Sequence, residues 1–518
     1  MAGFMNALKK EIPSVTENGA VGYKHTDNAL LDIAFKVPTL RRESNEKNLY
    51  KTYFEDAFEF DKNHALKWLL YLRDIRGGLG ERDAFRNILV NMSNADSEEV
   101  LKLINECKLD EYGRWDDLIY LYANTKQIEI KIAILKLISV QFDEDLNNMN
   151  VDKPCSLLAK WMPSINASSK KTRKIALELV KGLHLTKANY RCCLSSLREY
   201  LNVIETKMSS NKWNEIDYNK VPSKANLIYS KAFMIHDSER RMQYIDDLKS
   251  GKKDVKINAD TLMPYDIVHK YGYIEDSWYS RYQKYEYDEV MEQMWKALPS
   301  YFTDKTMIPV VDVSGSMTVT IGNKGTVSAM DVSIAMGIYC AQHNKSKEYG
   351  NKFITFSYEP NMIDIGNKSL RDSIDKVVNG GNIGYNTDAE AVFDLILKTA
   401  IKNKLSQKDI PNSILFISDM EFDNARAMYN SPDQDTLMEI ISKKYEDKGY
   451  EMPKLIFWNV NSRTNTIPIT KNKNGLILVS GFSTSIFKMI CSEELDPYKA
   501  LCKELDVPRY SIIDEVFA

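Results

Sequence analysis

The spacing of apolar residues changes near residue 300, and this change constrains the fold more than any other feature of the 518-residue chain. Before it, segments such as HALKWLLYLRDIRG, SEEVLKLINECKL, IEIKIAILKLISVQF and TRKIALELVKGLHL carry apolar residues at intervals of three and four, as amphipathic helices do. After it, continuous apolar runs alternate with helical segments, which is typical of a parallel sheet covered on both faces. We therefore expect a multidomain protein, with an all-α helical array over residues 1–300 and an α/β Rossmann-like domain over residues 301–518.

The expected strands of the second domain are MIPVVDVS, NKFITFSY, SILFISDM, KLIFWNV and GLILVSGF. The expected helices among them are SAMDVSIAMGIYCAQHN, SLRDSIDKVV, AEAVFDLILKTAIKN and DTLMEIISKKYEDKGY. In sheets of this kind, ligands bind beyond the carboxyl ends of the strands, near the point where the strand order reverses. We therefore expect functional residues directly after the strands.

Three polar motifs lie at such positions. The first is Asp-Val-Ser-Gly-Ser at residues 312–316, after an apolar run, and the third is Ser-Asp-Met at 418–420, after another. The second is the Gly/Asn-rich loop at residues 380–388, which contains Thr387 and precedes a helix. Small hard cations prefer oxygen ligands, and hydroxyls and a carboxylate at alternate positions of a tight turn aim three oxygens at one point. Together, the motifs predict a site for a divalent cation.

The competing interpretation is that Ser314, Ser316 and Thr387 only cap helices, as Ser and Thr commonly do. One motif alone would leave the two interpretations about equal. Three motifs in order, each at the end of a predicted element, favour the cation site.

Other acidic residues lie beside these motifs. Asp388 could bind the metal instead, but we favour it as the N-cap of the helix that begins at Ala389. Glu421 and Asp423 follow the third motif in a loop, where we expect them to be exposed to solvent.

The three motifs resemble the metal-ion-dependent adhesion site (MIDAS) of von Willebrand factor A domains. This resemblance implies that Ser314, Ser316 and Thr387 supply hydroxyl ligands to Mg²⁺, or to another divalent cation such as Mn²⁺ or Ca²⁺. It also implies that Asp312 and Asp419 hold the waters of the metal. An Asp or Glu of a protein partner would fill the open coordination position.

The helical half has a basic region, although the net charge of the whole chain is −3. Residues 156–200 contain 9 Lys and Arg against 2 Glu, and aromatic residues lie among them. Basic side chains on one face of a helical array can neutralise phosphates, and aromatic rings can stack on bases. The alternative is a solvated helix face with core aromatics. The candidate RNA-binding residues are Lys170, Lys171, Arg173, Lys174, Lys187 and Arg191.

Residues 157–225, AFMIHDSERR, IFWNVN and LVSGF resemble an uncharacterised family of helical-plus-von-Willebrand-A proteins. That family is similar in architecture to the TROVE module of the Ro ribonucleoprotein, in which HEAT-like helical repeats form a ring that binds small non-coding or structured RNA. The resemblance implies an RNA-binding protein with a Mg²⁺-binding A domain. The alternatives are a metal-dependent protein–protein adaptor, or an architectural component of a larger assembly, without RNA binding.

The remaining features narrow the class of protein. No apolar run reaches the roughly 18 residues of a membrane-spanning helix, and the seven cysteines form no C-x-x-C pair, so we expect a cytoplasmic protein with no membrane contact. The histidines form no H-E-x-x-H motif and no G-x-S-x-G is present, so we expect a binding protein and not an enzyme. In the segment 73–82, two glycines end a helix, and we expect the arginines to form ion pairs with neighbouring acids more readily than phosphate contacts.

Overall fold

The computed structural model divides the chain into two compact units, each assembled from separate stretches of sequence. Unit 1 consists of Met1–Asn45, Asp56–Trp68 and Ala259–Val507, and unit 2 consists of Glu46–Glu55, Leu69–Asn258 and Pro508–Ala518. Unit 1 therefore includes N-terminal segments that the expected boundary near residue 300 separates from it. The structure describes residues 13–19, 21–26, 28–271, 287–300, 307–321, 326–356, 360–380, 388–422, 437–464, 466–467, 476–483, 486–490 and 496–517.

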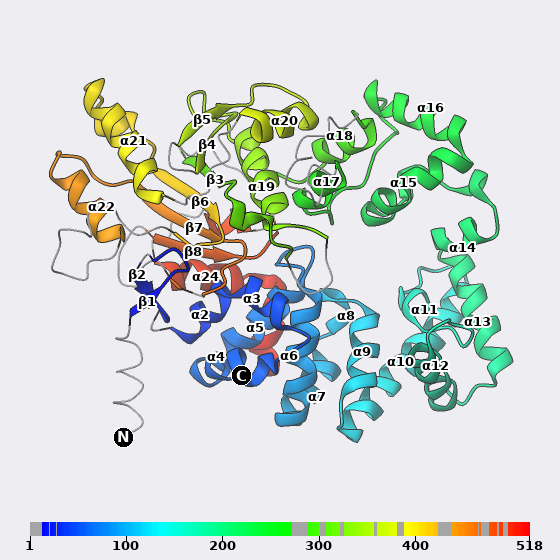
Figure 1. Ribbon diagram of the computed structural model, residues 1–518. Helices are drawn as coiled ribbons and strands as arrows, with labels where there is room; N and C mark the ends of the chain where they lie inside the picture. The colour runs from blue at the N-terminus through cyan, green and yellow to red at the C-terminus, as the bar shows by residue number, and fades with distance from the viewer. Residues whose placement is uncertain are drawn as a thin grey trace, which may run out of the picture. The chain divides into compact units, whose positions relative to one another are not determined.

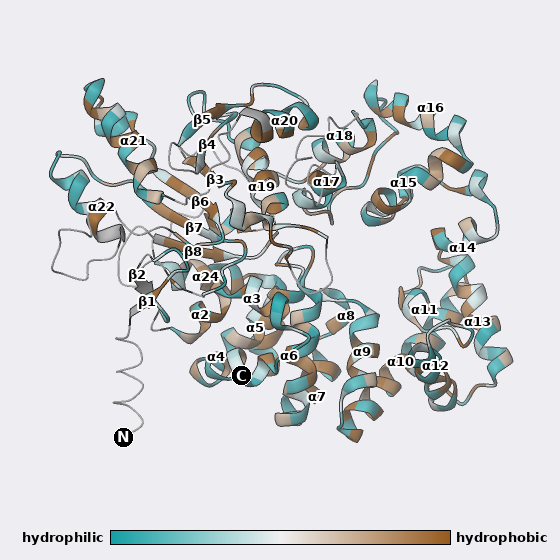
Figure 2. Cartoon of the chain, viewed as in Figure 1, coloured by the Kyte–Doolittle hydropathy of each residue, from teal (hydrophilic) through white to brown (hydrophobic). Residues whose placement is uncertain are grey.

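A six-stranded sheet forms the centre of unit 1 (Figure 1). Its strands are β3 (Met307–Asp312), β4 (Lys352–Phe356), β5 (Asn361–Asp364), β6 (Ser413–Ser418), β7 (Lys454–Asn459) and β8 (Leu476–Ser480). Five of them match the predicted apolar runs, and their brown colour in Figure 2 reflects that composition. The remaining strand, β5, lies at one edge of the sheet and was not predicted.

The strand order is β5-β4-β3-β6-β7-β8, with β5 antiparallel to β4 and all other neighbours parallel. Along the chain, β4 and then β5 follow β3 on one side of it, and β6, β7 and β8 then follow in order on its other side. The strand order thus reverses between β3 and β6, and in sheets of this kind ligands bind beyond the carboxyl ends of the strands at such a reversal. The first and third polar motifs lie at these two strand ends.

Helices pack on this sheet, as predicted. Helix α19 (Ala329–His343) packs on β3, β4 and β6, and Ser328 and Asp331 form a reciprocal capping box at its N-terminus. The other described α-helices that lie wholly or mostly in unit 1 are α2 (Ala29–Phe35), α3 (Val37–Glu43), α4 (Glu55–Phe60), α17 (Pro264–Tyr271), α18 (Glu289–Lys296), α20 (Leu370–Gly380), α21 (Ala389–Lys402), α22 (Leu437–Glu446), α23 (Ile486–Ile490) and α24 (Pro497–Leu505).

The N-terminal stretch is part of the same unit. Helix α2 packs against the edge strand β8, where the hydroxyl of Ser480 donates to the carbonyl of Ala34 at 2.5 Å and accepts from the N–H of Val37 at 3.2 Å. Before α2, a short hairpin of β1 (Pro13–Val15) and β2 (Val21–Tyr23) pairs through Tyr23 with Ile467.

Unit 2 is helical in its described part. The predicted helices are confirmed, and α10 (Ile128–Asn150) packs against the helices on both sides of it in sequence. Helix α5 (Lys62–Arg73) begins in unit 1 and ends in unit 2. The other helices are α6 (Arg82–Ala95), α7 (Ser97–Glu106), α8 (Leu109–Tyr112), α9 (Trp115–Asn124), α11 (Leu158–Trp161), α12 (Lys170–Gly182), α13 (Lys187–Tyr200), α14 (Ile204–Ser209), α15 (Ser223–His236), α16 (Ser238–Lys249) and α25 (Ile512–Val516). Among the described helices of the chain, none has the length and apolar character required to cross a bilayer.

Candidate metal centre

The end of β3 presents a carboxylate and two hydroxyls. Asp312 is the last residue of the strand, is fully buried, and accepts a hydrogen bond from the N–H of Ser314 at 2.9 Å. The chain then enters the short 3₁₀ helix η4 (Gly315–Thr318), which brings Ser316 Oγ to 3.0 Å from Ser314 Oγ. Ser314 precedes this helix but its side chain makes no capping hydrogen bond, so the capping interpretation does not describe it. The first motif therefore gathers its oxygens at one place.

The end of β6 meets the end of β3 through Ser418. Its hydroxyl donates to Asp312 Oδ2 at 2.6 Å and accepts from the N–H of Met420 at 3.1 Å. Met420 has a φ of 63°, a left-handed conformation that turns the chain sharply after Asp419. Ser418 belongs to the third motif, but sequence spacing does not show that it links the two strands.

Asp419 lies beside the residues of the first motif. It is 1% exposed, and Ser316 forms a side-chain hydrogen bond with it. Burial and the neighbouring carboxylate of Asp312 raise the pKa of Asp419 to about 7, and the bond with Ser316 opposes that rise. Two carboxylates thus repel each other in a buried position, and a cation between them would remove that repulsion.

These donors fit a hard cation. Four of the five predicted ligand residues, namely Asp312, Ser314, Ser316 and Asp419, are connected by hydrogen bonds or by direct electrostatic interaction. Thr387 lies outside the described residues. Among the described residues no group of three His, Cys, Asp or Glu side chains could hold a metal. Hydroxyl and carboxylate oxygens are the donors that Mg²⁺ accepts.

The acidic residues that lie beside the three motifs have different hydrogen-bond partners. Asp388 accepts a hydrogen bond from the N–H of Ala391 at 2.9 Å, which confirms it as the N-cap of α21. The expectation that Glu421 is exposed was wrong, since it is fully buried and accepts the N–H of Arg463 at 2.7 Å. Asp423 lies outside the described residues. Sequence reasoning also missed Arg463, whose Nη2 lies 3.3 Å from Asp419 Oδ2.

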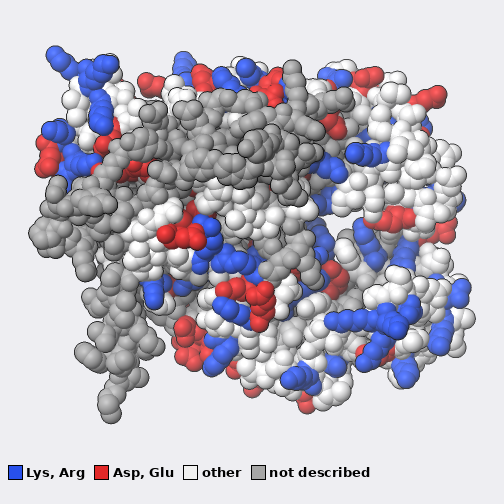
Figure 3. Space-filling view, viewed as in Figure 1, with Lys and Arg blue, Asp and Glu red and all other residues white. Residues whose placement is uncertain are grey.

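The predicted RNA-binding residues lie on α12 and α13 of unit 2. Five of them are exposed, and Figure 3 shows Lys and Arg side chains gathered over these helices. Arg173 is only half-exposed, and its guanidinium donates to the carbonyls of Ala167 at 2.7 Å and Ser168 at 3.0 Å. Arg173 therefore stabilises the turn before α12. The five exposed residues are Lys170, Lys171, Lys174, Lys187 and Arg191.

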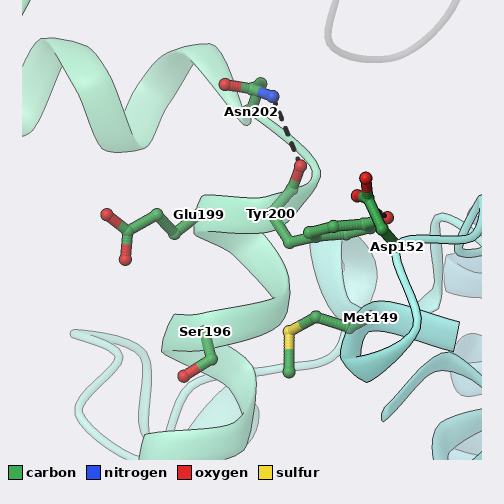
Figure 4. Close-up of a pocket in the computed structure, with 6 residues that line it drawn as sticks. All are labelled: Met149, Asp152, Ser196, Glu199, Tyr200 and Asn202. Atoms are coloured by element: carbon green, nitrogen blue, oxygen red, sulfur yellow. Dashed lines mark hydrogen bonds between the residues drawn. The ribbon is translucent and has the colours of Figure 1, made fainter. Parts of the chain in front are cut away.

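A surface hollow of unit 2 lies at the end of α13, against the end of α10 (Figure 4). Its lining includes the carboxylates of Asp152 and Glu199, and the hydroxyl of Tyr200 donates to Asp152 at 3.1 Å. Carboxylates repel phosphates, so this hollow does not extend the basic surface. The lining residues are Met149, Asp152, Ser196, Glu199, Tyr200 and Asn202.

In the segment 73–82 the expected ion pairs are present, in part with other partners. Arg82 pairs with Asp83 at 2.8 Å, whereas Arg73 is buried and pairs with Asp117 at 2.8 Å. Arg73 is therefore not available to a phosphate.

Two family models match parts of the chain, and the boundary between them lies near residue 300, where the spacing of apolar residues changes. Residues 306–504 match the family model described as Domain of unknown function (DUF7788), and residues 117–307 match Domain of unknown function (DUF2828). The two matched segments overlap at residues 306–307, where β3 begins. An uncharacterised protein of Acanthamoeba polyphaga mimivirus is 28% identical to this chain, over 95% of this chain and 87% of that protein.

The solved structure of the RO (RSR) protein of Deinococcus radiodurans is similar with a TM-score of 0.47. The alignment covers 94% of this chain and 100% of that protein, at 13% sequence identity. A score below 0.5 assigns neither fold nor function, so any assignment depends on the residues of this chain.

Proposed function

We propose that unit 1 is a von Willebrand factor A-like domain that binds a divalent cation at the carboxyl ends of β3 and β6. The first candidate for this cation is Mg²⁺. The observation that carries this proposal is the buried pair Asp312 and Asp419, from two neighbouring strands, linked to the hydroxyls of Ser314 and Ser316. The bound cation would supply a Lewis-acidic position that an acidic side chain of a partner protein can occupy.

The residues of the chain have distinct tasks in this proposal. Ser314 and Ser316, with Thr387, would contact the metal, and Asp312 and Asp419 would hold its waters. Ser418 keeps the Asp312 carboxylate in place by donating to it at 2.6 Å. Because Asp312, Ser314, Ser316 and Asp419 are fixed to strand ends or tight turns, these four groups would need little rearrangement to receive a cation.

Calorimetric titration of the full chain with Mg²⁺ and Mn²⁺ tests this proposal. We expect saturable binding, and we expect Asp312→Asn and Ser316→Ala to weaken it roughly 10- to 100-fold. Thr318→Ala is the matched control, because Thr318 lies in the same 3₁₀ helix but donates to the carbonyl of Gly315 at 2.8 Å. A wild-type protein that takes up neither metal would refute the proposal.

We propose in addition that the exposed basic side chains of α12 and α13 bind RNA, of the small structured kind. The support is the concentration of cations on a chain whose net charge is −3, together with their exposure. Phosphate contacts made by such side chains release counterions, so binding of this kind depends steeply on salt.

The test is binding of a short RNA hairpin at several salt concentrations. We expect the variant Lys170→Gln/Lys174→Gln/Lys187→Gln to bind more weakly, with the slope of log K against log salt reduced by roughly one for each lost phosphate contact. The matched control replaces Lys231, Lys253 and Lys256, which are exposed elsewhere in unit 2. An unchanged slope would favour the alternative, a metal-dependent adaptor or architectural protein without RNA. Asp312→Asn should leave RNA binding unchanged.

A further inference from the structure

The N-terminal hairpin is attached to the segments that follow β6 and β7. Ser14 Oγ lies 2.9 Å from Thr466 Oγ1, in the segment after β7, and Thr16 Oγ1 donates to the carbonyl of Phe422 at 2.6 Å. Tyr23 and Ile467 exchange two backbone hydrogen bonds of 2.8 and 2.7 Å. The hairpin therefore has a defined position beside the end of β6.

Glu421 holds these segments together. It is fully buried, and its carboxylate accepts the backbone N–H groups of Glu17 at 2.8 Å, Arg463 at 2.7 Å and Thr464 at 2.9 Å. A buried carboxylate with several N–H donors is a stable arrangement that fixes the backbone of each donor. Glu421 thus sets the positions from which the side chains of Glu17 and Arg463 extend.

Arg463 extends toward the metal site. Its Nη2 lies 3.3 Å from Asp419 Oδ2 and 2.5 Å from Glu17 Oε2, so one guanidinium nitrogen is shared by a site carboxylate and a hairpin carboxylate. Its Nε is buried and has no hydrogen-bond partner among the described residues. The Glu17 side chain is 54% exposed, so its hold on Arg463 can change without unfolding the core.

We propose that Arg463 is an internal cation that competes with the metal for Asp419, and that Glu17 draws it away, so that the N-terminal hairpin sets the metal affinity. This inference depends on the function proposed above. A positive charge beside a cation site weakens metal binding by Coulomb repulsion, and partial exposure and salt keep the effect moderate. A partner that displaced the hairpin would remove Glu17 and lower the affinity for the metal.

The test measures Mg²⁺ affinity of the full chain in variants of opposite expected sign. Arg463→Gln should bind Mg²⁺ roughly 3- to 10-fold more tightly, because the competing charge is gone. Glu17→Gln should bind roughly 2- to 5-fold more weakly, because Arg463 then pairs with Asp419 alone. The double variant should resemble Arg463→Gln, because Glu17 acts through Arg463.

Two controls separate this effect from net charge and from misfolding. Lys398→Gln removes an equally positive side chain that is 75% exposed on α21, and it should leave the affinity unchanged. Arg463→Lys keeps the charge and should stay within about twofold of the wild type. Equal affinities of wild type and Arg463→Gln would overturn this inference alone. Absence of Mg²⁺ binding in both would overturn the inference and the proposed function together.

Discussion

At the scale of single residues, Asp74 shows how this chain keeps a carboxylate inside unit 2. It is fully buried, and it accepts hydrogen bonds from Arg509 Nη2 at 3.0 Å, from the Tyr510 hydroxyl at 3.1 Å and from the N–H of Arg76 at 3.0 Å. Arg509 Nε donates to it as well. A buried charge that loses its partner costs more than an exposed pair contributes.

We therefore expect Arg509→Ala to lower the free energy of unfolding of unit 2 by about 3 kcal/mol. Arg82→Ala, which breaks the exposed pair with Asp83, should cost less than about 1 kcal/mol. Native-state hydrogen exchange of amides in α9 and α10 measures both values. Equal losses in the two variants would contradict this account of Asp74.

The partner of Asp74 could not be read from the sequence, because it lies 435 positions away. We expected pairs among neighbouring charges, and spacing patterns carry information only about neighbours on one element. The same limit explains why Glu421 was expected at the surface and why Arg463 was missed. By contrast, the proximity of Asp312, Ser314, Ser316 and Asp419 could be predicted, because the ends of parallel strands meet at one edge of a sheet.

At the scale of elements, the contact of α19 with β3 fixes the end of the strand that carries Asp312. Gly337 makes this contact possible, because a Cβ at its position would lie 2.3 Å from Val311 Cγ2. Val311 is fully buried in β3 and β-branched, so it has little freedom to move.

Gly337→Ala should therefore destabilise unit 1 by about 1–3 kcal/mol, although alanine alone would favour the helix by about 1 kcal/mol. Gly182→Ala, in α12, is the comparison: its Cβ would meet Leu135 Cδ2 at 2.8 Å, at the end of a flexible side chain. Urea denaturation of both variants measures the difference. A cost for Gly337→Ala no larger than that for Gly182→Ala would mean that β3 can shift.

Elements with strong apolar patterns were predicted, and short ones were not. Five strands of the sheet have continuous apolar runs that are buried. The missed strand β5 has four residues with only one buried, and the hairpin strands have three residues each. Such segments are strands because neighbouring backbone pairs with them, which no local pattern reveals.

At the scale of the whole molecule, the spacing of apolar residues changes near residue 300, where the matches to two family models meet. This position is not the edge of a compact unit. Residues 259–271 and the N-terminal segments belong with the sheet, and Pro508–Ala518 belongs with the helices. Apolar periodicity predicts the type of each element. It does not predict which distant elements share a core, because that depends on contacts between segments far apart in sequence.

The attachment of α2 to β8 has a consequence for synthesis of the chain. Ala34 leaves the ribosome 446 residues before Ser480, the residue to which it is hydrogen-bonded. At ordinary rates of translation, that interval is roughly 20 to 90 s. Throughout it, β8 is not yet available to pack against α2, whose residues Leu30, Leu31, Ile33 and Phe35 are all buried in the finished protein. The apolar face of α2 therefore reaches its final packing only after nearly the whole chain has been made.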